Sequence, residues 1–299
     1  MKRIVSVSLG ASDRNRKFQV ALLGQDFEIE RVGTDGDVKR AAALIAELDG
    51  QVDFIGLGGT DLALFAGGRR YELRDAVRMA SAAKTTPVVD GANYKAAVEP
   101  YVIEWIARRG VVDFKGAHVL MVAASDRPAM AALFPQLGAE VIYGDLLFSV
   151  GVPVPMRSLT TVAILAFLFL PLLARLPMSL LYPTGEKQQT HKPKHQRYFQ
   201  WADVIAGDFH YIKRYMPTDI SGKVVITNTT RRDDVALLRE RHCRALIATT
   251  PEFEGETFGA NVTEGVLLAL MGKRPEDAAQ QDYLDTLAKL GWEPAVVEF

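Results

Sequence analysis

The spacing of hydrophobic and polar positions changes repeatedly along this chain, and the changes predict an α/β protein. In the N-terminal part, short apolar runs bounded by turn residues predict strands at 4–9, 18–33 (two strands with a turn at Gly24), 52–58 and 87–89. Stretches with helical spacing lie between and after these strands, at 34–50, 74–84 and 94–110. Because strands that alternate with helices are typical of parallel sheets, we expect a mostly parallel sheet here.

A second run of alternation begins near Lys115. It predicts strands at 118–124, 140–143, 203–207, 223–227 and 245–249, with the first helix at 128–137. Parallel strands joined by crossover helices make a doubly wound sheet. We therefore expect two lobes: an N-terminal α/β domain over 1–112, and a Rossmann-like domain over 113–299 that carries an apolar and basic insertion at about 151–200.

The inserted segment contains the most hydrophobic stretch of the chain, 159–182. It shows no polar face from Leu159 to Ala174, and Pro171 and Arg175 interrupt its continuation to Tyr182. A membrane-spanning helix needs about 20 apolar residues, whereas a helix that is apolar on all sides is usually buried in protein. The preferred interpretation is a helix buried in the chain or in a homodimer interface. A membrane-surface anchor comes second and a spanning helix last.

The composition is that of a globular protein. Of the 299 residues, 48% are hydrophobic and 24% are charged, and the net charge of -1 gives no general attraction to nucleic acids. A single cysteine, Cys243, cannot form an internal disulfide, which indicates a reducing compartment. We therefore expect a cytoplasmic protein, with membrane association through 159–182 as the alternative. The basic stretch at 191–201 is expected to dock through its aromatic side chains rather than to bind nucleic acid.

The loop between the strand at 118–124 and the helix at 128–137 has the position of a dinucleotide-binding loop. Glycines normally let the backbone approach the cofactor's pyrophosphate there, but this loop has Ala124 and Ser125 instead. Asp145 ends the next strand, where a carboxylate that binds a ribose hydroxyl belongs. The candidates for binding NAD or NADP are Ser125, Arg127, Asp145 and Asn228. The missing glycines favour a loop that binds no cofactor, or binds it weakly.

Polar side chains follow nearly every predicted strand, and the carboxyl ends of strands are where open α/β sheets bind ligands. His210 titrates near neutral pH, so it is the leading candidate for proton transfer, with Asp208 as its orienting acid and Lys213 as a base if it is desolvated. The candidates for substrate binding are Asp61, Asp90, Asn93, Thr250, Glu252 and Asn261. Glu252, Glu254 and Glu256 lack the flanking ligands of a cation site, so no metal is expected.

Several segments resemble a known bacterial family when they are taken together. They are "SVSLGASDR", "GTDGD", "GLGGTDL", "PVVDGA", "LYPTGEKQ", "WADVIAGDFHYIKRYMP" and "TTPEFEGETFGANVTEG". The resemblance covers most of the chain, and the family is labelled quinate 5-dehydrogenase. Quinate and shikimate dehydrogenases have an N-terminal α/β substrate domain, a C-terminal Rossmann domain, a Gly-rich cofactor loop and a Lys–Asp catalytic pair. No Lys–Asp pair of this sequence matches a motif of those enzymes.

The resemblance implies an oxidoreductase that acts on a small polyhydroxylated acid with a nicotinamide cofactor. Two alternatives stay open. The chain is a non-catalytic protein that binds a small molecule without a dinucleotide loop, or it is a membrane-surface enzyme whose apolar segment admits an amphiphilic substrate. All three place a small-molecule ligand in a cleft at the strand ends.

Overall fold

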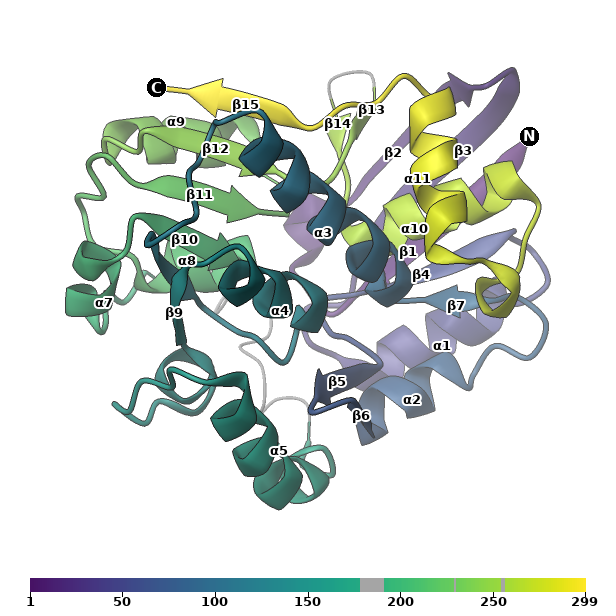
Figure 1. Ribbon diagram of the computed structural model, residues 1–299. Helices are drawn as coiled ribbons and strands as arrows, with labels where there is room; N and C mark the ends of the chain where they lie inside the picture. The colour runs from purple at the N-terminus through teal and green to yellow at the C-terminus, as the bar shows by residue number, and fades with distance from the viewer. Residues whose placement is uncertain (178–190, 229, 254–255) are drawn as a thin grey trace.

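The computed structural model describes residues 1–177, 191–228, 230–253 and 256–299, which form two lobes, each built on its own sheet (Figure 1). The first sheet has five strands in the order β2-β3-β1-β4-β7, all parallel except the edge strand β2. Its strands are β1 (Lys2–Ser8), β2 (Arg16–Leu22), β3 (Gln25–Gly33), β4 (Phe54–Gly58) and β7 (Val88–Val89). Helices α1 (Val38–Leu48) and α2 (Arg74–Ala80) cover one face, and a short 3-10 turn η1 (Ser12–Arg14) follows β1.

The second sheet has six strands in the order β15-β12-β11-β10-β8-β9, with only β15 antiparallel. Its parallel strands are β8 (His118–Met121), β9 (Glu140–Tyr143), β10 (Val204–Gly207), β11 (Val224–Thr227) and β12 (Ala245–Ala248). Its helices are α4 (Pro128–Gln136), α7 (Gln196–Trp201), α8 (Phe209–Tyr215) and α9 (Arg232–Glu240). In β8, Val119 packs into one hydrophobic core and Leu120 into the other, because neighbouring strand residues point to opposite faces.

The α/β class with parallel sheets in two lobes is thus confirmed. The order β9-β8-β10-β11-β12 is the flavodoxin-like order of doubly wound sheets. It has one strand beyond β8 on the β9 side, where the six-stranded dinucleotide-binding order has two. The Rossmann-like assignment of this lobe therefore stays a prediction.

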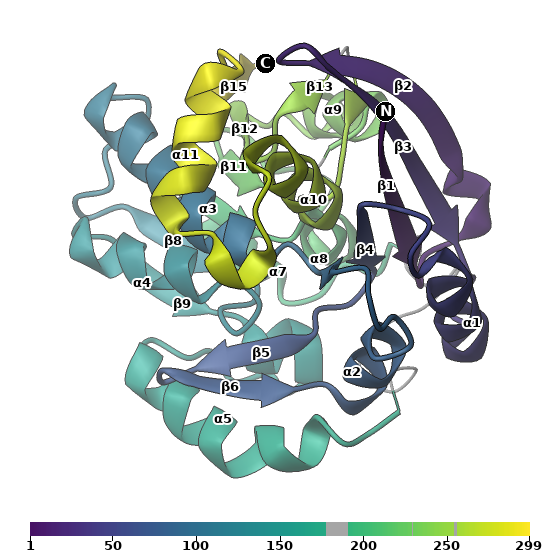
Figure 2. The same cartoon turned by 90° about the vertical axis from the view of Figure 1, so that its right-hand side faces the viewer.

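The chain passes between the lobes more than once. Helix α3 (Ala92–Arg108) leads from β7 to the second lobe, and the hairpin of β13 (Glu252–Phe253) and β14 (Glu256–Thr257) leads back. Helix α10 (Ala260–Met271) then packs against β1 and β4, and helix α11 (Gln280–Lys289) against α3, before β15 (Ala295–Glu298) closes the second sheet (Figures 1 and 2). Gly91 has φ +90°, and a Cβ there would lie 2.6 Å from that of Ala260, so this glycine allows α3 and α10 to start side by side. The predicted domain boundary at 112/113 stays a prediction.

The inserted segment differs from one half of the preferred interpretation, burial within the chain, while burial in a homodimer interface stays a prediction. After a π-helical turn η2 (Asp145–Val150), helix α5 (Leu159–Leu173) lies against the hairpin of β5 (Ala63–Ala66) and β6 (Arg69–Glu72), at the edge of the molecule (Figure 2). Val162 and Ala166 are buried, whereas 51% of Phe167 and 67% of Leu172 are exposed. Burial of this helix within the chain is therefore wrong, because one helical face meets the hairpin and the opposite face, equally apolar, meets solvent. Residues 178–182 of the segment lie outside the described residues.

Within the described ranges, no helix combines the length and the apolar content that a bilayer crossing requires. The basic stretch that follows docks on the second lobe as predicted. Tyr198 and Phe199 are buried in the core beside α8, and the backbone N–H of Lys192 donates to the carbonyl oxygen of Arg214 at 2.7 Å.

Candidate functional site

A cleft of about 800 Å³ lies between the lobes, where the carboxyl ends of both sheets meet. In each sheet the strand order reverses at one point, between β1 and β4 in the first sheet and between β8 and β10 in the second. Residues that end or follow these strands line the cleft from both sides, namely Ser8, Gly58, Asp61, Ser125, Asp126 and Asp208. Ligands of open α/β sheets bind at such reversal points, so this cleft is the candidate site.

The base of the cleft holds a buried lysine between two carboxylates. The Nζ of Lys95, at the start of α3, donates to Oδ1 of Asp61 at 2.7 Å and to Oδ1 of Asp126 at 2.9 Å. Asp61 follows β4 of the first sheet and Asp126 follows β8 of the second, so the ammonium group joins the two lobes. Burial disfavours the charged amine, but Asp126 and Asp61 outweigh it and raise the pKa of Lys95, which therefore stays protonated.

The two carboxylates of this cluster differ in their acidity. Burial raises the pKa of Asp61 well above its usual range, and the attraction of Lys95 only partly offsets this. Burial acts in the same direction on Asp126, but Lys95 and Arg127 together bring the pKa of Asp126 below its usual range. Two carboxyl groups with separated pKa values form an acid–base unit, in which Asp61 can hold a proton while Asp126 stays ionised.

Arg127 is buried among carboxylates inside the protein. Only 2% of its surface is exposed, and its guanidinium forms ion pairs with Glu99 on α3, with Asp126 at 3.3 Å and with Asp208 at 3.3 Å. Burial raises the pKa of Glu99, which Arg127 partly counters. The prediction that Arg127 holds a cofactor anion finds no support in this geometry, because three carboxylates already surround its charge.

The expected cofactor loop carries an internal anion. The carboxylate of Asp145 accepts hydrogen bonds from the backbone N–H groups of Ala124 and Ser125, each at 2.9 Å, and from the hydroxyl of Ser125 at 2.6 Å. These are donors that a pyrophosphate would need at this loop. Asp145 therefore stabilises the loop instead of extending toward a ribose, and the residues do not fit a dinucleotide bound in the conventional way.

The three predicted catalytic residues line the cleft but do not form the predicted arrangement. Asp208 is the N-cap of α8 and accepts from the backbone N–H of His210 at 2.8 Å, so the expected contact between the acid and the imidazole is replaced by a helix cap. Its other oxygen accepts from Asn228 Nδ2 at 3.0 Å, which places Asn228 in the same internal network instead of against a cofactor. Desolvation lowers the pKa of His210, whose side chain lines the cleft and is still exposed to solvent. Lys213 is not desolvated, because it is half-exposed and pairs with Asp234 at 2.7 Å.

Of the predicted substrate-binding residues, Asp61, Asp90 and Asn261 line the cleft. The carboxylate of Asp90 accepts from the backbone N–H groups of Leu62 and Ala92, at 2.6 and 3.0 Å, so it fixes the turns around the site. Asn261 Nδ2 donates to the hydroxyl of Ser6 at 2.8 Å.

The other three candidates lie away from the cleft. Asn93 turns from the cleft and donates to Oε1 of Glu264 at 3.0 Å. Thr250 is buried, and Glu252 belongs to the exposed start of β13. Strand-end position alone misplaced Thr250 and Glu252, because the chain leaves the second sheet after β12, and it misplaced Asn93, because that residue already belongs to the first turn of α3. Among the described residues no cluster of metal-binding side chains occurs, and Glu254 of the acidic group lies outside them.

The sequence did contain a signal for Lys95. Lys95, Glu99, Val102 and Ile106 follow one another at helical spacing, and all four are buried on one side of α3. Charged residues at core positions of a helix are rarely buried without partners. This pattern marks an internal ion-pair network, although it does not reveal Asp61 and Asp126 as the partners.

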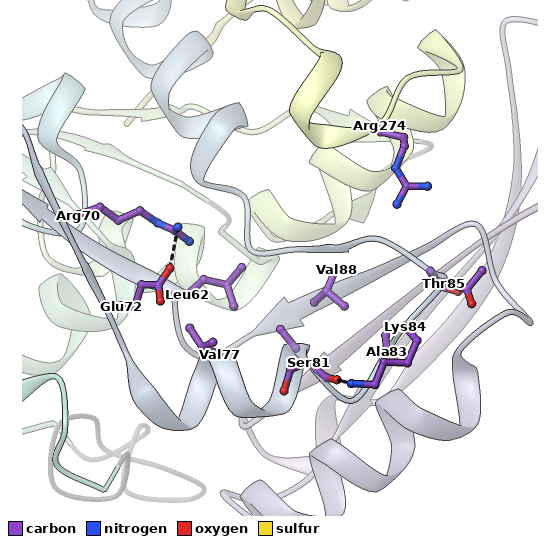
Figure 3. Close-up of a pocket in the computed structure, with 12 residues that line it drawn as sticks. Leu62, Arg70, Glu72, Val77, Ser81, Ala83, Lys84, Thr85, Val88 and Arg274 are labelled. Atoms are coloured by element: carbon purple, nitrogen blue, oxygen red, sulfur yellow. Dashed lines mark hydrogen bonds and ion pairs between the residues drawn. The ribbon is translucent and has the colours of Figure 1, made fainter.

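A second hollow of about 320 Å³ lies on the outer side of the first lobe, beside α2 (Figure 3). Its polar groups satisfy one another: Arg70 pairs with Glu72 at 2.8 Å, and the Nζ of Lys84 donates to the carbonyl oxygen of Ser81 at 2.6 Å. Because these groups are already paired within the hollow, the cleft between the lobes remains the candidate site.

Residues 93–299 match the family model of a domain of unknown function (DUF8754), and residues 3–90 match a second such model (DUF8753). The chain therefore belongs to the DUF8754 family. No curated protein matches the sequence.

Several solved structures are similar to the whole chain at low identity. The hetero-hexameric glutamate dehydrogenase of Thermus thermophilus is 14% identical with a TM-score of 0.45, over 97% of this chain and 73% of its own. A solute-binding protein of an ABC transporter from Burkholderia multivorans is 9% identical with a TM-score of 0.39, over 99% of both chains. The 5-methylthioribose-binding protein of Thermotoga lettingae is 10% identical with a TM-score of 0.38, over 99% of this chain and 85% of its own. With TM-scores this low, no property of these proteins is carried over to this chain.

Proposed function

We propose that this protein is an enzyme that binds a small polyhydroxylated acid in the cleft between its lobes and provides acid–base catalysis at one of the acid's hydroxyl groups. The observation that carries the proposal is the position of Lys95, which is buried at the base of the cleft between carboxylates from both sheets. Perturbed acid–base groups that converge in a cleft are typical of catalytic sites.

The proposed roles follow from the charges. Asp61, whose pKa is raised by burial, exchanges the proton with the ligand oxygen. Lys95 stays protonated and stabilises negative charge that develops on that oxygen, while Asp126 keeps the ammonium group in place. The cleft is also lined by Ser6, Ser8 and Asn261, whose side chains are suited to hydroxyl groups.

A more specific form of this proposal is that the enzyme oxidises the ligand at the same hydroxyl group. This is the reaction that the resemblance to quinate 5-dehydrogenases implies. It requires a hydride acceptor, for which NAD or NADP is the candidate. Because Asp145 occupies the donors of the loop after β8, we assign no step to a dinucleotide at that loop.

A non-catalytic role in binding a small molecule is the second candidate. It is favoured by the same loop, since an internal carboxylate in place of a phosphate fits a fold that holds its ligand without a dinucleotide. A membrane-surface enzyme with an amphiphilic substrate is the third, and the exposed apolar face of α5 favours it.

Calorimetric titration with quinate tests the proposal, with cyclohexanecarboxylate as the matched acid without ring hydroxyls. We expect the wild type to bind quinate more tightly. Asp61→Asn should weaken quinate binding, whereas Asp277→Asn on the outer surface should not. Following the ligand by proton NMR, with and without NAD or NADP, separates the candidates: conversion supports an enzyme, and binding without conversion supports a binding protein. Equal binding of both acids would overturn the proposal.

A further inference from the structure

A group of arginines lies at the mouth of the cleft, apart from the Lys95 cluster at its base. Arg14 comes from η1 and Arg31 from β3 of the first lobe, and Arg231 precedes α9 of the second lobe. All three line the cleft. Like charges from opposite lobes therefore face one space, which the carboxylates of Asp13 and Asp233 also line.

These guanidinium groups are close enough to disfavour one another. Burial and then the charges of Arg14 and Arg231 lower the pKa of Arg31 to about 10. Burial and then Arg231 lower the pKa of Arg14. Within the described part of the chain, none of the three forms an ion pair. Asp234, a nearby carboxylate, is already held by Lys213 at 2.7 Å.

Neighbouring backbone adds positive potential to the same region. Arg31 is fixed by hydrogen bonds to the hydroxyl of Ser8 and the carbonyl oxygen of Ala11, both at 3.1 Å. Two residues before Ser8 on β1, Ser6 accepts a hydrogen bond from Asn261 in the first turn of α10. That first turn lines the cleft and has no side-chain cap, so the positive end of the helix dipole faces the same space.

We propose that Arg14, Arg31 and Arg231 bind a dianionic oxyanion, a phosphate monoester or free phosphate, in the cleft. One carboxylate takes a single guanidinium in a bidentate pair and would leave two like charges facing each other. A phosphate group carries about -1.5 to -2 charges at neutral pH and three acceptor oxygens, so it can contact all three. The inference deepens the proposed function, since it names a charged group on the ligand of the same cleft.

The test is calorimetric titration of the full chain with glucose 6-phosphate, inorganic phosphate and acetate at matched ionic strength. We expect both phosphates to bind and acetate not to. Arg14→Gln and Arg231→Gln should each weaken phosphate binding about tenfold, the loss of one charge-assisted hydrogen bond. Arg31 is left intact because it also holds Ser8 and Ala11.

Arg232→Gln is the matched control, because it removes the same charge one residue along the chain from a side chain that does not line the cleft. Tighter binding of the sugar phosphate indicates a phosphorylated ligand, and equal binding indicates free phosphate; both support the site. If acetate binds as well as phosphate, or Arg232→Gln weakens binding as much as Arg231→Gln, the proposal is wrong. Asp61→Asn should leave phosphate binding intact, so failure of the proton-transfer proposal would not be mistaken for failure of this one.

Discussion

Glu264 offers the sharpest prediction about stability. Its carboxyl group lies on α10, behind the cleft, with 1% of the residue exposed. Oε1 accepts from Asn93 at 3.0 Å and from the hydroxyl of Tyr283 at 3.4 Å, whereas Oε2 is buried without a hydrogen-bond partner. Burial first, and then the nearby charge of Asp90, raise the pKa of Glu264 from 4.5 to about 7. The folded protein therefore prefers the protonated acid.

The sign of the pH dependence follows from this direction. At a pH between 4.5, the pKa of Glu264 in the unfolded chain, and about 7, its pKa in the folded protein, the folded state binds the proton and the unfolded state does not. The free energy of unfolding therefore falls as the pH rises. The loss begins near the unfolded value of 4.5 and is complete above the folded value of about 7. A shift of this size corresponds to about 3 kcal/mol, since each pKa unit is worth about 1.36 kcal/mol.

Glu264→Gln mimics the protonated acid at every pH, because its amide keeps an acceptor for Asn93 and carries no charge. We expect the variant to be less than about 1 kcal/mol more stable than the wild type near pH 5, and about 3 kcal/mol more stable near pH 8. Urea unfolding across this range measures the difference, and subtraction removes the titration of all other groups. Parallel stability profiles of the two proteins would refute the reasoning, because they would mean that Glu264 ionises in the folded state as it does in the unfolded chain.

Three other changes test separate parts of the structure. Arg127→Met should lower the free energy of unfolding in urea by about 3–5 kcal/mol, because Glu99 stays buried without its partner, whereas Arg108→Met on the surface should change it by less than about 0.5 kcal/mol. NAD and NADP should bind weakly or not at all in calorimetric titrations, and micromolar binding that is lost in Asp145→Ala would contradict the role given to that carboxylate. Leu168→Ser, on the exposed face of α5, should leave urea unfolding within about 0.5 kcal/mol but reduce self-association in sedimentation experiments, and unchanged sedimentation would mean that this face takes no part in assembly.

The arrangement of strands could be predicted because it depends on local patterns. The period-two run in 18–33, with Gly24 between its halves, predicts the antiparallel pair of β2 and β3. The strands at 203–207, 223–227 and 245–249 have unbroken apolar centres, as expected for strands covered on both faces, and β10, β11 and β12 lie at these places. Their parallel order then brings Asp208 and Asn228 to one edge, where both line the cleft.

The pairing of charges at the site could not be predicted in the same way. Lys95 meets Asp61 and Asp126 across 34 and 31 residues of chain, and no spacing rule connects positions so far apart. The prediction that helix α5 is buried within the chain was wrong for a different reason. An apolar surface predicts burial only when a partner is present, and among the described residues the hairpin of β5 and β6 covers one face of α5, whereas Phe167, Leu168 and Leu172 stay exposed.

The distribution of charge within the cleft has a consequence for how a ligand is held. At the base, Lys95 and Arg127 form ion pairs with residues of α3 and of both strand-end loops, so the two lobes are joined there by attraction. At the mouth, Arg14 and Arg231 face each other from opposite lobes with charges of the same sign. A neutral ligand would leave the repulsion between Arg14 and Arg231 in place, whereas an anion bound between them would attract both guanidinium groups. The two proposals together therefore describe a ligand that carries hydroxyl groups at the end that meets Asp61 and negative charge at the other end.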